Sequence, residues 1–134
     1  TYAGAIGTGA AGLTKQDAGT LILSGTNTYA GTTSVSAGTL RVANGSALGA
    51  TGAGNATTVA PGATLEFFGG AAVGAEPVSV TGAGVGGNGV LRNLSGVNSL
   101  AGPVTLTAAS RFVSDAGTLT LSGGITGGFE VSLN

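Results

Sequence analysis

The nine residues 17–25, DAGTLILSG, return as DAGTLTLSG at residues 115–123 with one letter changed. A second echo overlaps the first, because SGTNTYAG at residues 24–31 returns as SGVNSLAG at residues 95–102. Self-similarity within one chain is the signature of a repeat architecture, in which each repeat stacks on the next. We therefore expect the two nine-residue stretches to occupy the same corner of a coiled chain, about four turns apart.

The composition restricts the fold class. At 134 residues the chain suffices for one domain, which we expect to span residues 1–134. It has 28 glycines, yet 42% of its residues are hydrophobic, and Leu and Val recur in order. The sequence is therefore neither collagen, which needs glycine at every third position, nor a flexible linker. An all-β protein with many tight turns remains, with helix content near zero.

Charge, Cys content and apolar runs exclude several functions. Only 7% of the residues are charged and the net charge is −1, so we expect no nucleic-acid partner. Cys and His are both absent, which excludes disulfides and thiolate chemistry. The apolar runs are far too short for a direct membrane span. Because the chain starts without Met in the middle of a repeat, we expect a slice of a longer repeat protein.

The first leucine after each glycine turn gives the spacing of the turns. These leucines are separated by 19, 25, 26 and 28 residues, and they form the predicted core stack Leu21, Leu40, Leu65, Leu91 and Leu119. Steps of this size suit a single-stranded parallel β-helix, or β-solenoid, of about five rungs. An antiparallel sandwich also has short strands, but it makes no demand for recurring sequence.

Several of these stretches, taken in order, resemble a known repeat. Residues 12–15 (GLTK), 18–25 (AGTLILSG), 27–33 (NTYAGTT) and 37–42 (AGTLRV) resemble the autotransporter-associated β-strand repeat, and residues 89–124 resemble a variant of it. Residues 45–88 fit more loosely. The resemblance implies a right-handed parallel β-helix from the passenger domain of a bacterial surface or secreted protein. It therefore implies a location that is extracellular or on the bacterial cell surface.

The motifs for chemistry are weak. Residues 7–12 and 82–87 fit G-x-G-x-x-G, but both lead into strand-like, glycine-rich sequence, so we expect no dinucleotide and no other cofactor. Residues 86–91 lack the Asp of a calcium-binding nonapeptide, and we expect no metal site. Asp17 and Asp115 are expected to lie too far apart for a glycosidase pair, whereas spacing alone leaves Glu66 with Glu76 open. We expect no catalytic residues and no enzyme activity.

Charged and aromatic residues follow the leucines. Arg41, Glu66 and Arg92 each come directly after a leucine of the stack, so their side chains should point outward and form a ladder along one face. The alternative is three unrelated, solvated charges, and a bulge near Arg92 would break the ladder. In Phe67–Phe68, alternation places one ring outside, where it offers a possible contact for a ligand.

The function that we expect is structural. A low-charge rod segment, non-catalytic and extracellular, would space or display other material. The strand edges at the two ends of the β-helix are unpaired. They would pair with a second copy of the chain or with neighbouring repeats and so build a filament. The alternative is an adhesin-type binding module that recognises a glycan or a host protein through Phe68. A carbohydrate-active enzyme ranks below both.

Overall fold

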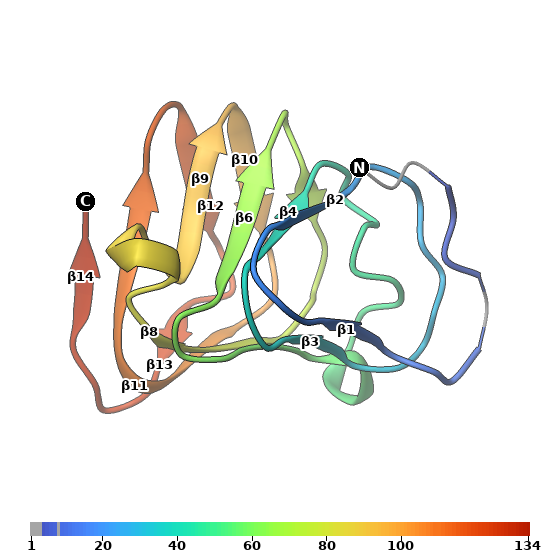
Figure 1. The fold of residues 1–134 in the computed structure, drawn as a ribbon, viewed down its shortest axis with the longest axis horizontal. Helices are drawn as coiled ribbons and strands as arrows, with labels where there is room; N and C mark the ends of the chain where they lie inside the picture. The colour runs from blue at the N-terminus through green and yellow to red at the C-terminus, as the bar shows by residue number, and fades with distance from the viewer. Residues whose placement is uncertain (1–3, 8) are drawn as a thin grey trace.

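The chain folds as a parallel β-solenoid of about six turns (Figure 1). The structure is a computed structural model, and it describes residues 4–7 and 9–134. All pairings between the described strands are parallel. Helical structure in this part of the chain amounts to two single 3₁₀ turns, Ala53–Asn55 and Val85–Gly87. The prediction of an all-β solenoid is confirmed, with about six turns where about five were expected.

Each turn of the coil passes three positions, which we call the first, second and third face. The first face consists of β1 (Leu13–Lys15), β3 (Thr33–Val35), β5 (Thr57–Val59), β8 (Val78–Gly82), the start of β11 (Val104–Ser114) and β13 (Ile125–Thr126). The second face consists of β2 (Thr20–Leu23), β4 (Thr39–Val42), β6 (Thr64–Phe68), β9 (Leu91–Ser95), the end of β11 and β14 (Val131–Leu133). The third face contains β7 (Ala72–Val73), β10 (Val97–Leu100) and β12 (Thr118–Leu121).

Alternating side chains build the core inside the coil. In β4, Leu40 and Val42 are fully buried, whereas Arg41 between them is only half-buried. Side chains on a strand point alternately to opposite faces, and register pairing therefore places one inward residue on the next along the axis. One turn alone would leave these side chains in water, so the stack of turns is what removes them from it.

The leucine stack has a different last member from the one expected. Leu21, Leu40, Leu65 and Leu91 pair in register on the second face, as predicted. The stack then continues through Phe112 and Leu133. Leu119 lies on the third face, where it pairs with Asn98. Its assignment to the stack was therefore wrong.

The physical reason is the length of β11. This strand runs without a break over eleven residues, Val104–Ser114, and carries the chain from the first face to the second. Residue 112 already fills the stack position, so the chain has passed the second face by residue 118. The stretches 17–25 and 115–123 thus lie at different corners, and the expectation of a shared corner was wrong.

The second pair of similar stretches, residues 24–31 and 95–102, does occupy the same corner of the coil. Asn27 follows β2 and Asn98 follows β9, and both strands lie on the second face. The Asn27 amide donates to the Ala47 carbonyl at 2.5 Å. The Asn98 side-chain oxygen accepts from the backbone N–H groups of Gly70 and Ala71 at 2.9 and 2.7 Å. Each buried Asn therefore bonds to the backbone of a neighbouring turn, which satisfies polar groups that the corner would leave unpaired.

Candidate functional site

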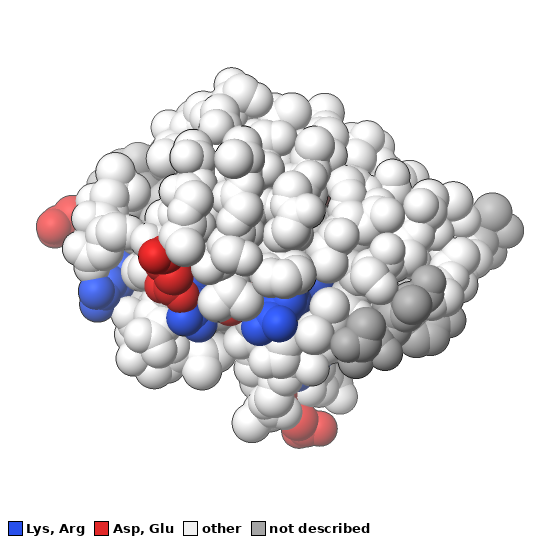
Figure 2. Space-filling model, turned by 90° about the horizontal axis from the view of Figure 1, so that it is seen from above, with Lys and Arg blue, Asp and Glu red and all other residues white. Residues whose placement is uncertain are grey.

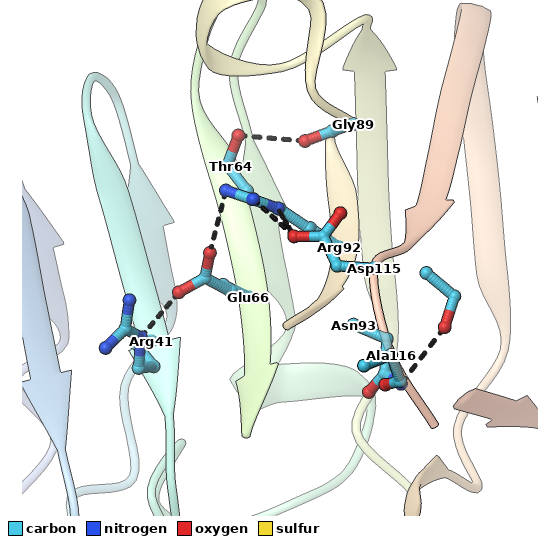
Figure 3. Close-up of polar contacts among 9 residues, drawn as sticks. Arg41, Thr64, Glu66, Gly89, Arg92, Asn93, Asp115 and Ala116 are labelled. Carbon is cyan, nitrogen blue, oxygen red and sulfur yellow. Dashed lines mark hydrogen bonds and ion pairs between the residues drawn. The ribbon is translucent and has the colours of Figure 1, made fainter. Parts of the chain in front are cut away.

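A row of alternating charges crosses neighbouring turns on the outside of the second face (Figure 3). Arg41 pairs in register with Glu66, and Glu66 with Arg92. Arg41 Nε donates to Glu66 Oε1 at 2.5 Å, and Arg92 Nη1 donates to Glu66 Oε2 at 3.3 Å. The register of this face shifts only beyond Phe67, so the bulge does not separate these three residues.

Asp115 extends the row by one more turn, which the sequence analysis did not foresee. Its Oδ2 accepts from Arg92 Nε at 2.8 Å and also from Arg92 Nη2. The backbone N–H of Asp115 donates to the Asn93 carbonyl, which fixes the carboxylate beside Arg92. We call Arg41, Glu66, Arg92 and Asp115 the charge ladder. On the face seen in Figure 2, most of the charged side chains gather in a short row, and the described surface around this row is white.

The electrostatics of the ladder indicate a structural role. The Glu66 side chain is 2% exposed, whereas those of Arg41 and Arg92 are 24% and 29% exposed. A buried carboxylate needs charged hydrogen-bond donors to offset its lost hydration, and here each oxygen has one. Because both oxygens are engaged, Glu66 presents no free atom to a substrate. The ladder instead favours one register between three turns, since a shift by one residue would bury the carboxylate without partners.

The two phenylalanines at the end of β6 lie on opposite sides of the coil wall. Phe67 is fully buried, and Phe68 is 39% exposed. The Arg41 guanidinium carbon lies 5.7 Å from the centre of the Phe68 ring, within the range of a cation–π contact. The outer ring therefore belongs to the same surface as the charge ladder.

A second polar group lies inside the coil, and the sequence analysis missed it. Tyr29, Thr33, Thr57 and Glu76 are all buried. The Tyr29 hydroxyl lies 2.5 Å from the Thr33 hydroxyl, and Thr57 Oγ1 donates to Glu76 Oε1 at 2.7 Å. Burial raises the pKa of Tyr29, and burial also raises the pKa of Glu76 to about 7. The signal in the sequence was the Thr33–Thr57 pair, which interrupts an otherwise apolar column of the first face.

Glu66 and Glu76 do not form a catalytic pair in the described structure. Glu66 lies between two arginines on the outside of the second face, and Glu76 bonds to Thr57 inside the coil. The glycine motif at residues 82–87 covers the end of β8 and one 3₁₀ turn, so no long helix follows it as a dinucleotide site requires. Among the residues described, no three Asp, Glu, His or Cys side chains cluster as metal ligands.

The ammonium group of Lys15 is bound by backbone carbonyls. It is buried, and its ammonium group donates to the carbonyls of Gln16, Asp17 and Ala37 at 2.8, 2.6 and 3.2 Å. Ala37 belongs to the next turn, so Lys15 ties two corners together. Three carbonyl acceptors engage all three donors of an ammonium group.

The C-terminal end of the solenoid carries an apolar groove. Ile125 and Leu133 are 40% and 68% exposed there, and Leu119 and Leu121 are half-buried. The groove is lined by Phe112, Val113, Ser114, Leu119, Leu121, Ile125, Leu133 and Asn134. The groove is the open end of the apolar core. Ile125 and Leu133 are the last members of the columns of stacked inward side chains on the first and second faces.

The comparison with protein-family models matches part of the chain. Residues 13–42 match the family model of the passenger-associated-transport-repeat. Neither the comparison with curated proteins nor that with solved structures gives a match. Within the part of the chain that the structure describes, no helix has the length and apolar character needed to cross a membrane. The matched residues contain the strands β1 to β4, and the parallel β-solenoid continues from them. Both findings fit an autotransporter passenger repeat.

Proposed function

We propose that this chain is a non-catalytic, extracellular rod segment of an autotransporter passenger. The observation that carries the proposal is the use of the polar side chains: the charge ladder, Asn27, Asn98 and Lys15 all bond across neighbouring turns. Polar groups that hold turns together are not available to convert a substrate. The match to a passenger repeat at residues 13–42 supports a location at the cell surface or outside the cell.

A scaffold depends on its number of turns and tolerates the loss of a whole one. Val104 pairs with Ile125, Phe112 with Leu133, and Leu100 with Leu121, so deletion of residues 104–124 removes one turn on all three faces. We expect this variant to unfold cooperatively and to be shorter by about 4.8 Å in small-angle scattering. The control, deletion of residues 104–113, removes only part of a turn and should lose the fold. Equal damage from both deletions would contradict the proposal.

The rod role includes growth at the ends. Ile125 and Leu133 are exposed at the C-terminal end, and the half-buried Leu13 and Leu21 begin the same two columns at the other end. We propose that the groove accepts the first turn of a second copy, which places Leu13 on Ile125 and Leu21 on Leu133. In a longer chain, a neighbouring repeat with the same columns would take that place.

Phe68 supports a second candidate function, that of an adhesin surface. Its ring is 39% exposed and lies beside Arg41, and aromatic and arginine side chains are enriched at interfaces with other molecules. A Phe68→Ala variant measured on a glycan array and on host cells tests this function. Binding that is lost in the variant supports the adhesin, and unchanged binding excludes a contact through this ring.

A further inference from the structure

Glu76 is a titratable group that the rod role does not use. It lies in the corner between β7 and β8 and is 0% exposed. Oε1 has the Thr57 hydroxyl as its donor, whereas Oε2 is buried without a hydrogen-bond partner. The ion pairs of the described residues all lie in the charge ladder, and the titratable side chain that faces Glu76 is Tyr29.

The free-energy cost of burying the Glu76 carboxyl with a single hydrogen bond depends on whether the carboxyl is protonated. A neutral carboxyl with one hydrogen bond is tolerated in an apolar interior, but an unpaired carboxylate there is strongly unfavourable. Burial therefore raises the pKa of Glu76 to about 7, against the Thr57 hydrogen bond, which lowers it. Because the folded-state pKa lies above the ordinary 4.5, the stabilisation is fully present below 4.5 and is lost as the pH rises through about 7.

The backbone around Glu76 joins three turns. The Pro77 carbonyl accepts from Thr57 N in the preceding turn at 2.9 Å. The Gly74 carbonyl accepts from Gly102 N in the following turn at 3.1 Å. An ionised Glu76 can reach water only if the corner at residues 74–77 moves outward, and that movement breaks these two bonds.

We propose that Glu76 is a proton-controlled latch, which keeps the corner at residues 74–77 closed when its carboxyl is protonated and lets it open when it is ionised. The solenoid is then tightest in mildly acidic surroundings and loosens at one corner around neutral pH. The device is independent of the rod role, because a rod without a titrating corner would serve equally well as a spacer.

Hydrogen exchange of single amides tests whether the corner at residues 74–77 is the part that opens. Relative to a Glu76→Gln variant, which carries no ionisable group at this position, we expect the Thr57 and Gly102 amides of the wild type to lose protection as the pH passes about 7. The Thr118 amide, which bonds to Gly96 at another corner, serves as the internal reference. Equal protection of Thr57 and Gly102 in wild type and variant across this range would overturn the latch.

The pH dependence of stability measures how strongly the ionisation of Glu76 destabilises the fold. The rise from 4.5 to about 7 means that the folded state binds this proton about 300-fold more tightly. The unfolding equilibrium constant of the wild type should therefore increase by up to about 300-fold more than that of Glu76→Gln between about pH 4 and pH 8. Glu130→Gln, at an exposed carboxylate, is the control and should follow the wild type.

A direct titration keeps the proposal testable if Glu76→Gln does not fold. The carboxyl ¹³C shift of Glu76 in the wild type should titrate with a midpoint near 7, and a midpoint near 4.5 would overturn the proposal. Thr57→Val removes the hydrogen bond that lowers the pKa of Glu76, so it should raise the midpoint further. Valine already occupies this column in the next two turns, at Val78 and Val104, and it therefore fits the site.

Discussion

Glu66→Gln tests whether the charge ladder holds turns together. The substitution keeps the shape of the side chain and removes its negative charge. In the wild type this carboxylate is 2% exposed and accepts hydrogen bonds from Arg41 and Arg92. The variant leaves an amide between two guanidinium groups that have no anion between them, while Arg92 retains Asp115.

The loss of unfolding free energy expected for Glu66→Gln lies between the values for breaking a surface ion pair and a buried one. A hydrogen bond to a charged group contributes about 1.5–3 kcal/mol, and breaking a fully buried pair costs about 3–5 kcal/mol. The Arg41 and Arg92 side chains are 24% and 29% exposed, so water recovers part of their hydration in the variant. We therefore expect Glu66→Gln to lower the free energy of unfolding by about 2 kcal/mol.

Urea unfolding followed by far-ultraviolet circular dichroism measures this loss as a lower midpoint with an unchanged slope. Asp115→Asn is the matched control, because the Asp115 side chain is 33% exposed and its pair with Arg92 should contribute less than about 1 kcal/mol. A double-mutant cycle with Arg41→Gln should give a coupling of about 1 kcal/mol with Glu66→Gln. If Glu66→Gln costs no more than Asp115→Asn, the argument that the ladder fixes the register is refuted.

Two further predictions concern the stacking of turns and the open end. Gly102→Ala should lower the free energy of unfolding by at least about 1–3 kcal/mol, because its Cβ would lie 1.9 Å from a backbone carbonyl oxygen of the preceding turn. Gly128→Ala, where a Cβ would meet nothing within 4 Å, is the control in the same urea experiment and should cost far less. Leu133→Glu should abolish concentration-dependent association in sedimentation velocity, because it places a charge in the C-terminal groove. Val97→Glu, at a side chain that is 75% exposed on the flank, should leave association unchanged, and a wild type that stays monomeric at all concentrations would contradict end-to-end stacking.

The glycine content has two physical causes, of which the sequence reveals one. Tight turns with positive φ account for glycines such as Gly38, as expected from the composition. Gly12, Gly31, Gly102 and Gly123 have no such backbone angle. At each of them a Cβ would come within 2.5 Å of backbone atoms in a neighbouring turn. That requirement becomes visible only when the turns are placed on each other.

Local sequence was sufficient for the fold and for part of the surface. Alternating Leu and Thr, with glycine at the corners, predicts short strands whose apolar side chains point one way. The spacing from Leu21 to Leu91 then predicts the stack and the outward position of Arg41, Glu66 and Arg92. These features follow from sequence because each depends on the alternation within one strand and on the glycine turn that precedes each leucine.

Tertiary structure decided which face each later segment reaches. The near-identical stretches at 17–25 and 115–123 have the same local preference, yet they lie at different corners, because the unbroken β11 changes how many residues separate successive corners. The same holds for Asp115, which joins the ladder from the next turn, and for Glu76, whose burial depends on Thr57 in the turn before. Alternation within a strand determines whether a side chain points inward or outward. The neighbours that it meets depend on the accumulated length of the intervening corners, which no single segment encodes.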